Sequence, residues 1–189
     1  PSQEQRNEAA RKMVRAWYRL FAAGRVFYAD LHPGNFLFLP DGRLGMIDFG
    51  FVLPLDEELW AMCGRLDRAM TTGREKDLVA AVKEWSCIAE EPAEAERLRL
   101  NVAYADWAWG SRYCGGEYDF GEEAEFRRGV DLAAEMIRKR YTRAHPCTPS
   151  ISRQNFGIRS LLYRLKAKID VRPIVEEELQ ATGWDRRYA

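Results

Sequence analysis

Residues 27–51 decide the fold of this chain, and they read FYADLHPGNFLFLPDGRLGMIDFGF. Short apolar runs in and beside this stretch predict strands at 26–29, 36–39 and 44–47. Pro33 and Gly34 place a loop after the first run, and Pro-Asp-Gly-Arg at 40–43 is typical of a turn between the other two. We therefore expect a strand, a loop and then a β-hairpin.

Polar side chains stand at the ends of these predicted strands. Asp30 lies in the loop, Asn35 opens the first hairpin strand, and Asp48 follows the second and begins Asp-Phe-Gly. In an antiparallel pair the start of one strand lies beside the end of its partner, so Asn35 and Asp48 should converge next to the Asp30 loop. Gly50 follows where the backbone must turn away. An Asp-Gly turn alone is common, but all three positions at both spacings are typical of a kinase-like phosphoryl-transfer site.

Three segments carry a resemblance to a known family: YADLHPGN at 28–35, PDGR at 40–43 and IDFG at 47–50. They resemble the UbiB/AarF family of atypical kinases, whose usual form is His-Ala-Asp-Pro-His-Pro-Gly-Asn, an Asp-Gly turn and Asp-Phe-Gly. Aminoglycoside and choline kinases are similar at a greater distance. The resemblance is specific over residues 24–51 and loose beyond them.

The resemblance implies a role for each matched residue. Asp30 corresponds to the catalytic Asp, which accepts or orients the proton of an attacking hydroxyl or water. Asn35 and Asp48 correspond to the residues that hold Mg²⁺ beside ATP. His32 stands where protein kinases have Lys and is expected to bind the nucleotide with Asn35 and Asp48, which favours a small-molecule or lipid-type phosphotransferase or an ATPase. Alternatively, His32 bonds nearby backbone. Tyr28 departs from the family's His, a scaffold position.

The parts of a kinase that cover the nucleotide are not found in these 189 residues. A Gly-rich loop, a strand Lys and a helix Glu would precede the catalytic loop, and neither these nor the family's Lys-x-Gly-Gln occurs. We therefore expect one α+β, mostly helical domain over residues 1–189, the carboxy-terminal lobe of a kinase-like fold. Residues 1–54 would form a helix and the catalytic hairpin, and 55–189 a helical subdomain. The amino-terminal lobe would be cut away, supplied in the same protein or by another chain, or naturally missing.

Apolar residues spaced three and four apart predict helices along the rest of the chain. The expected helices are 3–23, 56–70, 75–89, 92–109, 121–141, 152–169 and 174–180. Ser2 is the expected N-cap of the first helix and Gly24 its end, and its apolar face should pack beneath the hairpin.

Two segments have alternative interpretations. Residues 107–120 are rich in Trp and Tyr and are interpreted as a loop that fills the core; the alternative is an exposed patch for a protein partner or a lipid surface. The basic stretch 152–172 is interpreted as a docked helix with Arg159 and Arg164 on its solvated side. Its alternative is an amphipathic helix at an anionic membrane.

Charge and cysteine content narrow the function classes. The 29 basic and 29 acidic residues cancel, which argues against a nucleic-acid-binding protein. Four scattered cysteines and two histidines argue against a zinc cluster and favour free thiols in a reducing compartment. We find no signal peptide and no apolar run near the ~18 residues of a spanning helix. This predicts a cytoplasmic location, at most peripheral to a membrane.

The expected function is phosphoryl transfer or ATP hydrolysis that depends on ATP, Mg²⁺ and an amino-terminal lobe, with a link to quinone or lipid metabolism implied by the resemblance. One alternative is a non-catalytic scaffold or assembly subunit that keeps the kinase fingerprint. Another is a small-molecule phosphotransferase of the aminoglycoside or choline kinase type.

Overall fold

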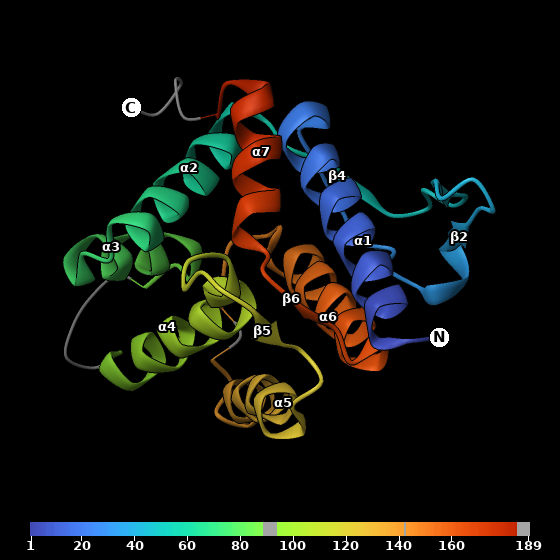
Figure 1. The fold of residues 1–189 in the computed structure, drawn as a ribbon. Helices are drawn as coiled ribbons and strands as arrows, with labels where there is room; N and C mark the ends of the chain where they lie inside the picture. The colour runs from blue at the N-terminus through green and yellow to red at the C-terminus, as the bar shows by residue number, and fades with distance from the viewer. Residues whose placement is uncertain (89–93, 142, 185–189) are drawn as a thin grey trace.

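The computed structural model describes residues 1–88, 94–141 and 143–184 (Figure 1). Its α-helices are α1 (Gln3–Gly24), α2 (Glu57–Thr72), α3 (Glu75–Trp85), α4 (Ala95–Trp109), α5 (Glu123–Arg138), α6 (Thr148–Leu165) and α7 (Arg172–Thr182), with 3-10 turns η1 (Pro33–Asn35) and η2 (Gly110–Arg112). Its strands are β1 (Val26–Tyr28), β2 (Phe36–Phe38), β3 (Leu44–Met46), β4 (Val52–Pro54), β5 (Tyr118–Asp119) and β6 (Lys168–Ile169). The mostly helical, α+β character is confirmed: within the described residues the strands form small antiparallel sheets between helices.

Helix α1 begins as predicted and ends one residue late. The Ser2 hydroxyl accepts a hydrogen bond from the Gln5 N–H, and the Gln5 side chain accepts one from the Ser2 N–H at 2.8 Å. Gly24 is the last helical residue, and Arg25 after it takes the left-handed conformation that ends the helix, with φ 50°. The Arg25 guanidinium lies over the Trp60 ring and pairs with Glu57, and these contacts hold a residue that is not glycine in that conformation.

The predicted hairpin is confirmed. Strands β2 and β3 pair antiparallel, with Phe36 opposite Met46, and Gly42 takes φ 81° in the turn. Strand β1 pairs with β4, which the sequence analysis did not predict, and Tyr28 faces Val52 in that pair. The hairpin projects from the molecule on the side of α1, away from α3 (Figure 1).

Helix α1 connects the hairpin to the helical core. It lies alongside α7 and α6, so the first and last parts of the chain share one core (Figure 1). Phe21 of α1 contacts Trp60 and Trp184 at ring distances of 5.4 and 5.2 Å. Two turns earlier in α1, Met13 packs with Tyr28 and Phe36, which confirms that this helix lies beneath the hairpin.

Several predicted helix ends differ from those in the structure. Helix α3 stops at Trp85, since Cys87 takes φ 50° and reverses the chain, and residue 89 lies outside the described residues. The expected start of α4 at Pro92 also lies outside them, and the described helix begins at Ala95. Helix α5 is shorter than 121–141 at both ends, and α7 is longer than 174–180 at both ends.

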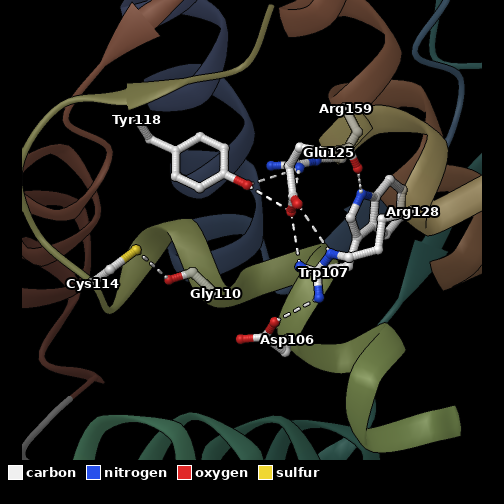
Figure 2. A network of polar contacts seen from close by, with 8 residues as sticks. All are labelled: Asp106, Trp107, Gly110, Cys114, Tyr118, Glu125, Arg128 and Arg159. Carbon is white, nitrogen blue, oxygen red and sulfur yellow. Dashed lines mark hydrogen bonds and ion pairs between the residues drawn. The ribbon is translucent and has the colours of Figure 1, made fainter. Parts of the chain in front are cut away.

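Helix α6 differs most from its prediction. It begins and ends four residues earlier than 152–169, because Lys166, the residue after its last turn, takes the left-handed conformation with φ 46°. Lys168 and Ile169 then form β6, which pairs with β5, so the segment 55–189 contains a small sheet as well as helices. Arg159, expected on the solvated side, is instead buried, with a side chain only 5 % exposed (Figure 2).

The aromatic segment 107–120 contributes to the core. Trp107 and Phe120 are buried, while Trp109, Tyr113 and Tyr118 are half-buried. The interpretation as core filling is therefore confirmed for Trp107 and Phe120. None of the described helices combines the length and the apolar character that a membrane span needs.

Candidate active site

The pairing of β1 with β4 brings the Asp30 loop beside the Asp-Phe-Gly segment. Ala29 follows β1 and donates its backbone N–H to the carbonyl of Phe51, which precedes β4, at 3.0 Å. Because the two strands are antiparallel, the residue after one lies opposite the residue before the other. Asp30 therefore lies beside Gly50, the last residue of Asp-Phe-Gly.

Asn35 joins the loop to the hairpin. It closes η1, and its side-chain nitrogen donates to the backbone oxygen of Asp30 at 2.9 Å and to Asp30 Oδ2 at 3.1 Å. The backbone carbonyl of Asn35 accepts the N–H of Ile47 at 3.2 Å, and Ile47 is the residue before Asp48. The Asn35 side chain is thus fixed against Asp30, and its backbone is fixed beside the residue before Asp48.

Gly50 lies next to the carboxylates of both Asp48 and Asp30. Asp48 Oδ1 accepts the Gly50 N–H at 2.8 Å. A Cβ added to Gly50 would lie 3.2 Å from Asp48 Oδ1 and 3.9 Å from Asp30 Oδ2. A side chain at this position would enter the space that both carboxylates border, so glycine keeps that space open. The structure therefore brings Asp30, Asn35 and Asp48 together, as the hairpin geometry predicts.

His32 has local contacts. Its Nδ1 accepts the N–H of Gly34 at 3.1 Å and caps η1, and its side chain is exposed. This hydrogen bond is the backbone contact that the alternative interpretation of His32 describes. A contact between His32 and a nucleotide stays a prediction.

Tyr28 is a buried residue that contacts both Asp48 and Asn35. Its side chain is fully buried, and its hydroxyl donates to the backbone oxygen of Asp48 at 2.6 Å and lies 3.5 Å from the Asn35 side-chain nitrogen. Burial raises the pKa of Tyr28 above its ordinary value, so the hydroxyl keeps its proton for that bond. Tyr28, where the resembled family has His, thus still serves as a scaffold residue.

Arg153 is a site residue that sequence reasoning missed. It comes from α6, and its Nε donates to the Ala29 carbonyl at 2.8 Å while its terminal nitrogen lies 3.1 Å from Asp30 Oδ1. Its guanidinium carbon lies 5.4 Å from the centre of the Phe51 ring. Arg153 and Asp30 are 123 residues apart, and the only signal in the sequence was the basic character of the helix.

The rim of the site is unusually apolar. Large hydrophobic side chains are exposed on the hairpin and on the segment that follows it: Leu37, Phe38, Ile47, Phe49 and Phe51. We call these five residues the hairpin patch. Exposed apolar side chains gathered in one place are typical of a surface that another segment or protein covers.

The donor set of the site is small. In the described parts of the chain, no three side chains of the types His, Cys, Asp and Glu are grouped as metal ligands. A divalent ion at this site would therefore depend on two carboxylates and an amide oxygen, together with whatever else it binds.

The amino-terminal part of the chain matches a known domain. Residues 1–79 match the family model described as the ABC1 atypical kinase-like domain. The chain is 42% identical over 53 residues to an uncharacterized protein of Synechocystis sp., and 40% identical over 48 residues to an uncharacterized aarF domain-containing protein kinase, chloroplastic, of Arabidopsis thaliana. These matches cover 28% and 25% of this chain but only 13% and 9% of the relatives, so the match spans a small part of their length. The resemblance to the AarF kinases is thus confirmed over residues 1–79, which match the ABC1 atypical kinase-like domain and contain Asp30, Asn35 and Asp48.

Proposed function

We propose that this chain supplies the catalytic half of an AarF-type phosphotransferase or ATPase that uses ATP and Mg²⁺. The observation that carries the proposal is that the Asp30 and Asp48 carboxylates border the same space at Gly50, with the Asn35 amide bonded to Asp30. The match of residues 1–79 to an atypical kinase-like domain supports it independently.

The side chains present fit a magnesium ion. Mg²⁺ prefers oxygen ligands, and Asp48 and Asn35 offer a carboxylate and an amide. The Asn35 nitrogen makes both hydrogen bonds to Asp30, which leaves the amide oxygen outside them. The space kept open at Gly50 adjoins Asp48 Oδ1. Asn35 and Asp48 would hold the ion, which would neutralise the charge of the nucleotide phosphates.

Asp30 would act on the acceptor. Its Oδ2 lies on the Gly50 side, where a hydroxyl or a water could donate a proton to it. Oδ1 is bound to Arg153 and Oδ2 accepts from Asn35, so the carboxylate is held in one orientation. A fixed carboxylate that orients the attacking group is the main contribution a protein makes to this chemistry, because positioning provides much of the acceleration.

The hairpin patch supports the need for a second lobe. Phe49 and Phe51 flank the Asp48–Gly50 turn and are 53% and 41% exposed. A nucleotide-covering lobe, in the same protein or another chain, would pack over this rim and remove the apolar surface from water. ATP would then lie between that lobe and the Asp48 side of the hairpin.

The path of the chain after Asp-Phe-Gly favours a small acceptor. Residues 52–54 are engaged as β4, and the N-cap of α2 follows at Asp56. This leaves a short connection where protein kinases carry a platform for a peptide. The acceptor class that fits is a small molecule, a lipid or water, and the family resemblance points to quinone or lipid metabolism.

A nucleotide-binding measurement tests this proposal. Mg-ATP should raise the melting temperature of the full-length gene product, and Asp48→Asn should abolish that shift. Asp41→Asn is a matched control, because Asp41 is an exposed residue of the same hairpin, at its turn. The absence of a shift in both the full-length product and this chain would remove the enzyme hypothesis.

The hairpin patch also favours a second candidate, a non-catalytic scaffold. In that case the exposed side chains Ile47 and Phe49 would bind a partner protein without any nucleotide. Substitution of both by Ser would then weaken partner binding, while Mg-ATP would have no effect on it. Stabilisation by Mg-ATP that Asp48→Asn abolishes favours the enzyme instead.

A further inference from the structure

The contact between Arg153 and the Asp30 loop involves three groups at once. Two neighbouring nitrogens of the guanidinium reach the Ala29 carbonyl and Asp30 Oδ1, at 2.8 and 3.1 Å. The Arg153 guanidinium also lies over the Phe51 ring. One side chain therefore fixes the backbone before Asp30, the carboxylate itself and the segment that follows Asp-Phe-Gly.

Helix α6 approaches the loop at a second point, one turn after Arg153. A Cβ on Gly157 would lie 2.6 Å from the Leu31 Cβ, closer than side chains pack. Gly157 therefore lets the loop rest directly on the helix. The contacts at Ala29, Asp30 and Leu31 show that α6 supports three successive loop residues.

We propose that Arg153 is a positioning residue for Asp30, supplied by the part of the chain that lies beyond the matched residues 1–79. This inference rests on the proposed function. Arg153 holds Oδ1 so that Oδ2 stays on the Gly50 side, where the acceptor and the metal-bound phosphate would meet. Helix α6 thus completes a site whose other residues come from the hairpin segment.

The geometry requires Arg rather than any cation. Exposed ion pairs contribute little by themselves, and the Arg153 side chain is 60% exposed. The guanidinium, however, carries its donors in a planar fork, which can bond a carbonyl and a carboxylate at once. A Lys ammonium can reach one of these oxygens but does not reproduce the fork.

The test uses ATP hydrolysis by the full-length product that contains this chain. Arg153→Met should lower kcat by about tenfold to a hundredfold, with the KM for Mg-ATP changed by less than about twofold, because misplacement of a reacting group affects the chemical step. Arg153→Lys should recover part of kcat. Arg164→Met is the matched control, an exposed Arg on the same helix, and should leave kcat unchanged. An unchanged kcat in Arg153→Met, or full recovery by Lys, would overturn the proposal.

Hydrogen exchange separates this inference from the proposed function. The His32 N–H bonds to the Asp30 carbonyl at 2.8 Å, and the Asn35 N–H bonds to the His32 carbonyl at 3.0 Å. In this chain alone, Arg153→Met should speed exchange at both amides by about tenfold, and Arg164→Met should not. Equal exchange in both variants would overturn the positioning role. A wild-type protein that neither binds Mg-ATP nor hydrolyses ATP would overturn the proposed function, while the exchange rates would still decide whether Arg153 orders the loop.

Discussion

The buried hydroxyl of Tyr28 donates a hydrogen bond to the backbone carbonyl of Asp48 at 2.6 Å. The two residues are 20 positions apart, and the bond joins β1 to the end of the hairpin. It fixes the position of the Asp48 backbone relative to β1 and the Asp30 loop that follows β1. A residue outside the set of expected ligands therefore holds the backbone of Asp48 in place.

Tyr28→Phe tests this relationship. Removal of the hydroxyl should lower the free energy of unfolding by about 0.5–1.5 kcal/mol, the usual contribution of one hydrogen bond. The rings of Phe36 and Phe49 would keep their contacts with residue 28. Urea denaturation measures the loss. Tyr163→Phe is a control, since the Tyr163 ring stacks on Phe126 and the phenyl ring keeps that contact. Equal losses in the two variants would show that the hydrogen bond of Tyr28 contributes nothing specific to the free energy of unfolding.

Gly50→Ala should damage the site more than the fold. The new methyl would lie 3.2 Å from Asp48 Oδ1, a tight contact that pushes the carboxylate aside. We expect the affinity for Mn²⁺, measured as a probe for Mg²⁺ by calorimetry, to fall by about tenfold. Gly45→Ala, in β3, meets only the ordinary distance of 3.5 Å to Leu37 and should bind Mn²⁺ as the wild type does. A normal affinity in Gly50→Ala would contradict the arrangement.

Glu125 compensates a buried cation, as Figure 2 shows. Arg159 lies 3.6 Å from Glu125 Oε1 and donates to the Tyr118 hydroxyl at 3.2 Å, and that hydroxyl donates to Glu125 at 2.8 Å. Glu125→Gln would leave the buried Arg159 charge without its carboxylate and should cost about 1–3 kcal/mol, the usual penalty for a buried polar group that loses its partner. Asp106→Asn, which removes an exposed partner of Arg128, should cost less than about 1 kcal/mol. Chemical denaturation of both variants gives the comparison, and similar losses would contradict the importance of burial.

The same carboxylate predicts the acid sensitivity of the fold. Burial alone would raise the pKa of Glu125, but hydrogen bonds from Arg128 and Tyr118 outweigh it and hold the pKa below the usual value. A lowered pKa in the folded state means that this stabilisation is complete above the unfolded value of about 4.3 and is lost as the pH falls through the folded value. Thermal melts from pH 6 down to 3 should show a smaller decline in Glu125→Gln than in the wild type. Parallel declines would contradict this.

The sequence predicts the hairpin and its three side chains because the relevant information is local. A Gly in the turn fixes the register, and the register places Asn35 and Asp48 at adjoining strand ends. The Tyr28 bond also follows from this region, but only once β4 is known to return to β1. Three-residue strands such as β4 have no periodicity to detect, so the sequence does not reveal that return.

Long-range contacts account for what sequence analysis misses. Strands β5 and β6 contain two residues each and pair across about 50 positions of the chain. Arg159 is polar in a helical pattern, yet the rings of Trp107, Tyr118 and Phe120 gather around it from other elements, each about 5 Å away. The spacing of apolar residues along α6 does not distinguish a buried Arg from a solvent-exposed one. Arg153 is missed for the same reason, since its partners lie at the other end of the chain.

The thiols should differ sharply in reactivity. All four cysteines are free, as the sequence predicts; Cys63 and Cys147 are buried, whereas Cys114 is exposed. Burial raises the pKa of Cys147 to about 11, and it raises the pKa of Cys63 further. At pH 8 both are almost wholly protonated and therefore poor nucleophiles. Iodoacetamide should label Cys114 first in the native chain, and Cys63 and Cys147 only after urea unfolds it, as mass spectrometry of peptides would show. Labelling of Cys147 at the rate of Cys114 in the native chain would mean that the core around Cys147 opens far more often than its burial implies.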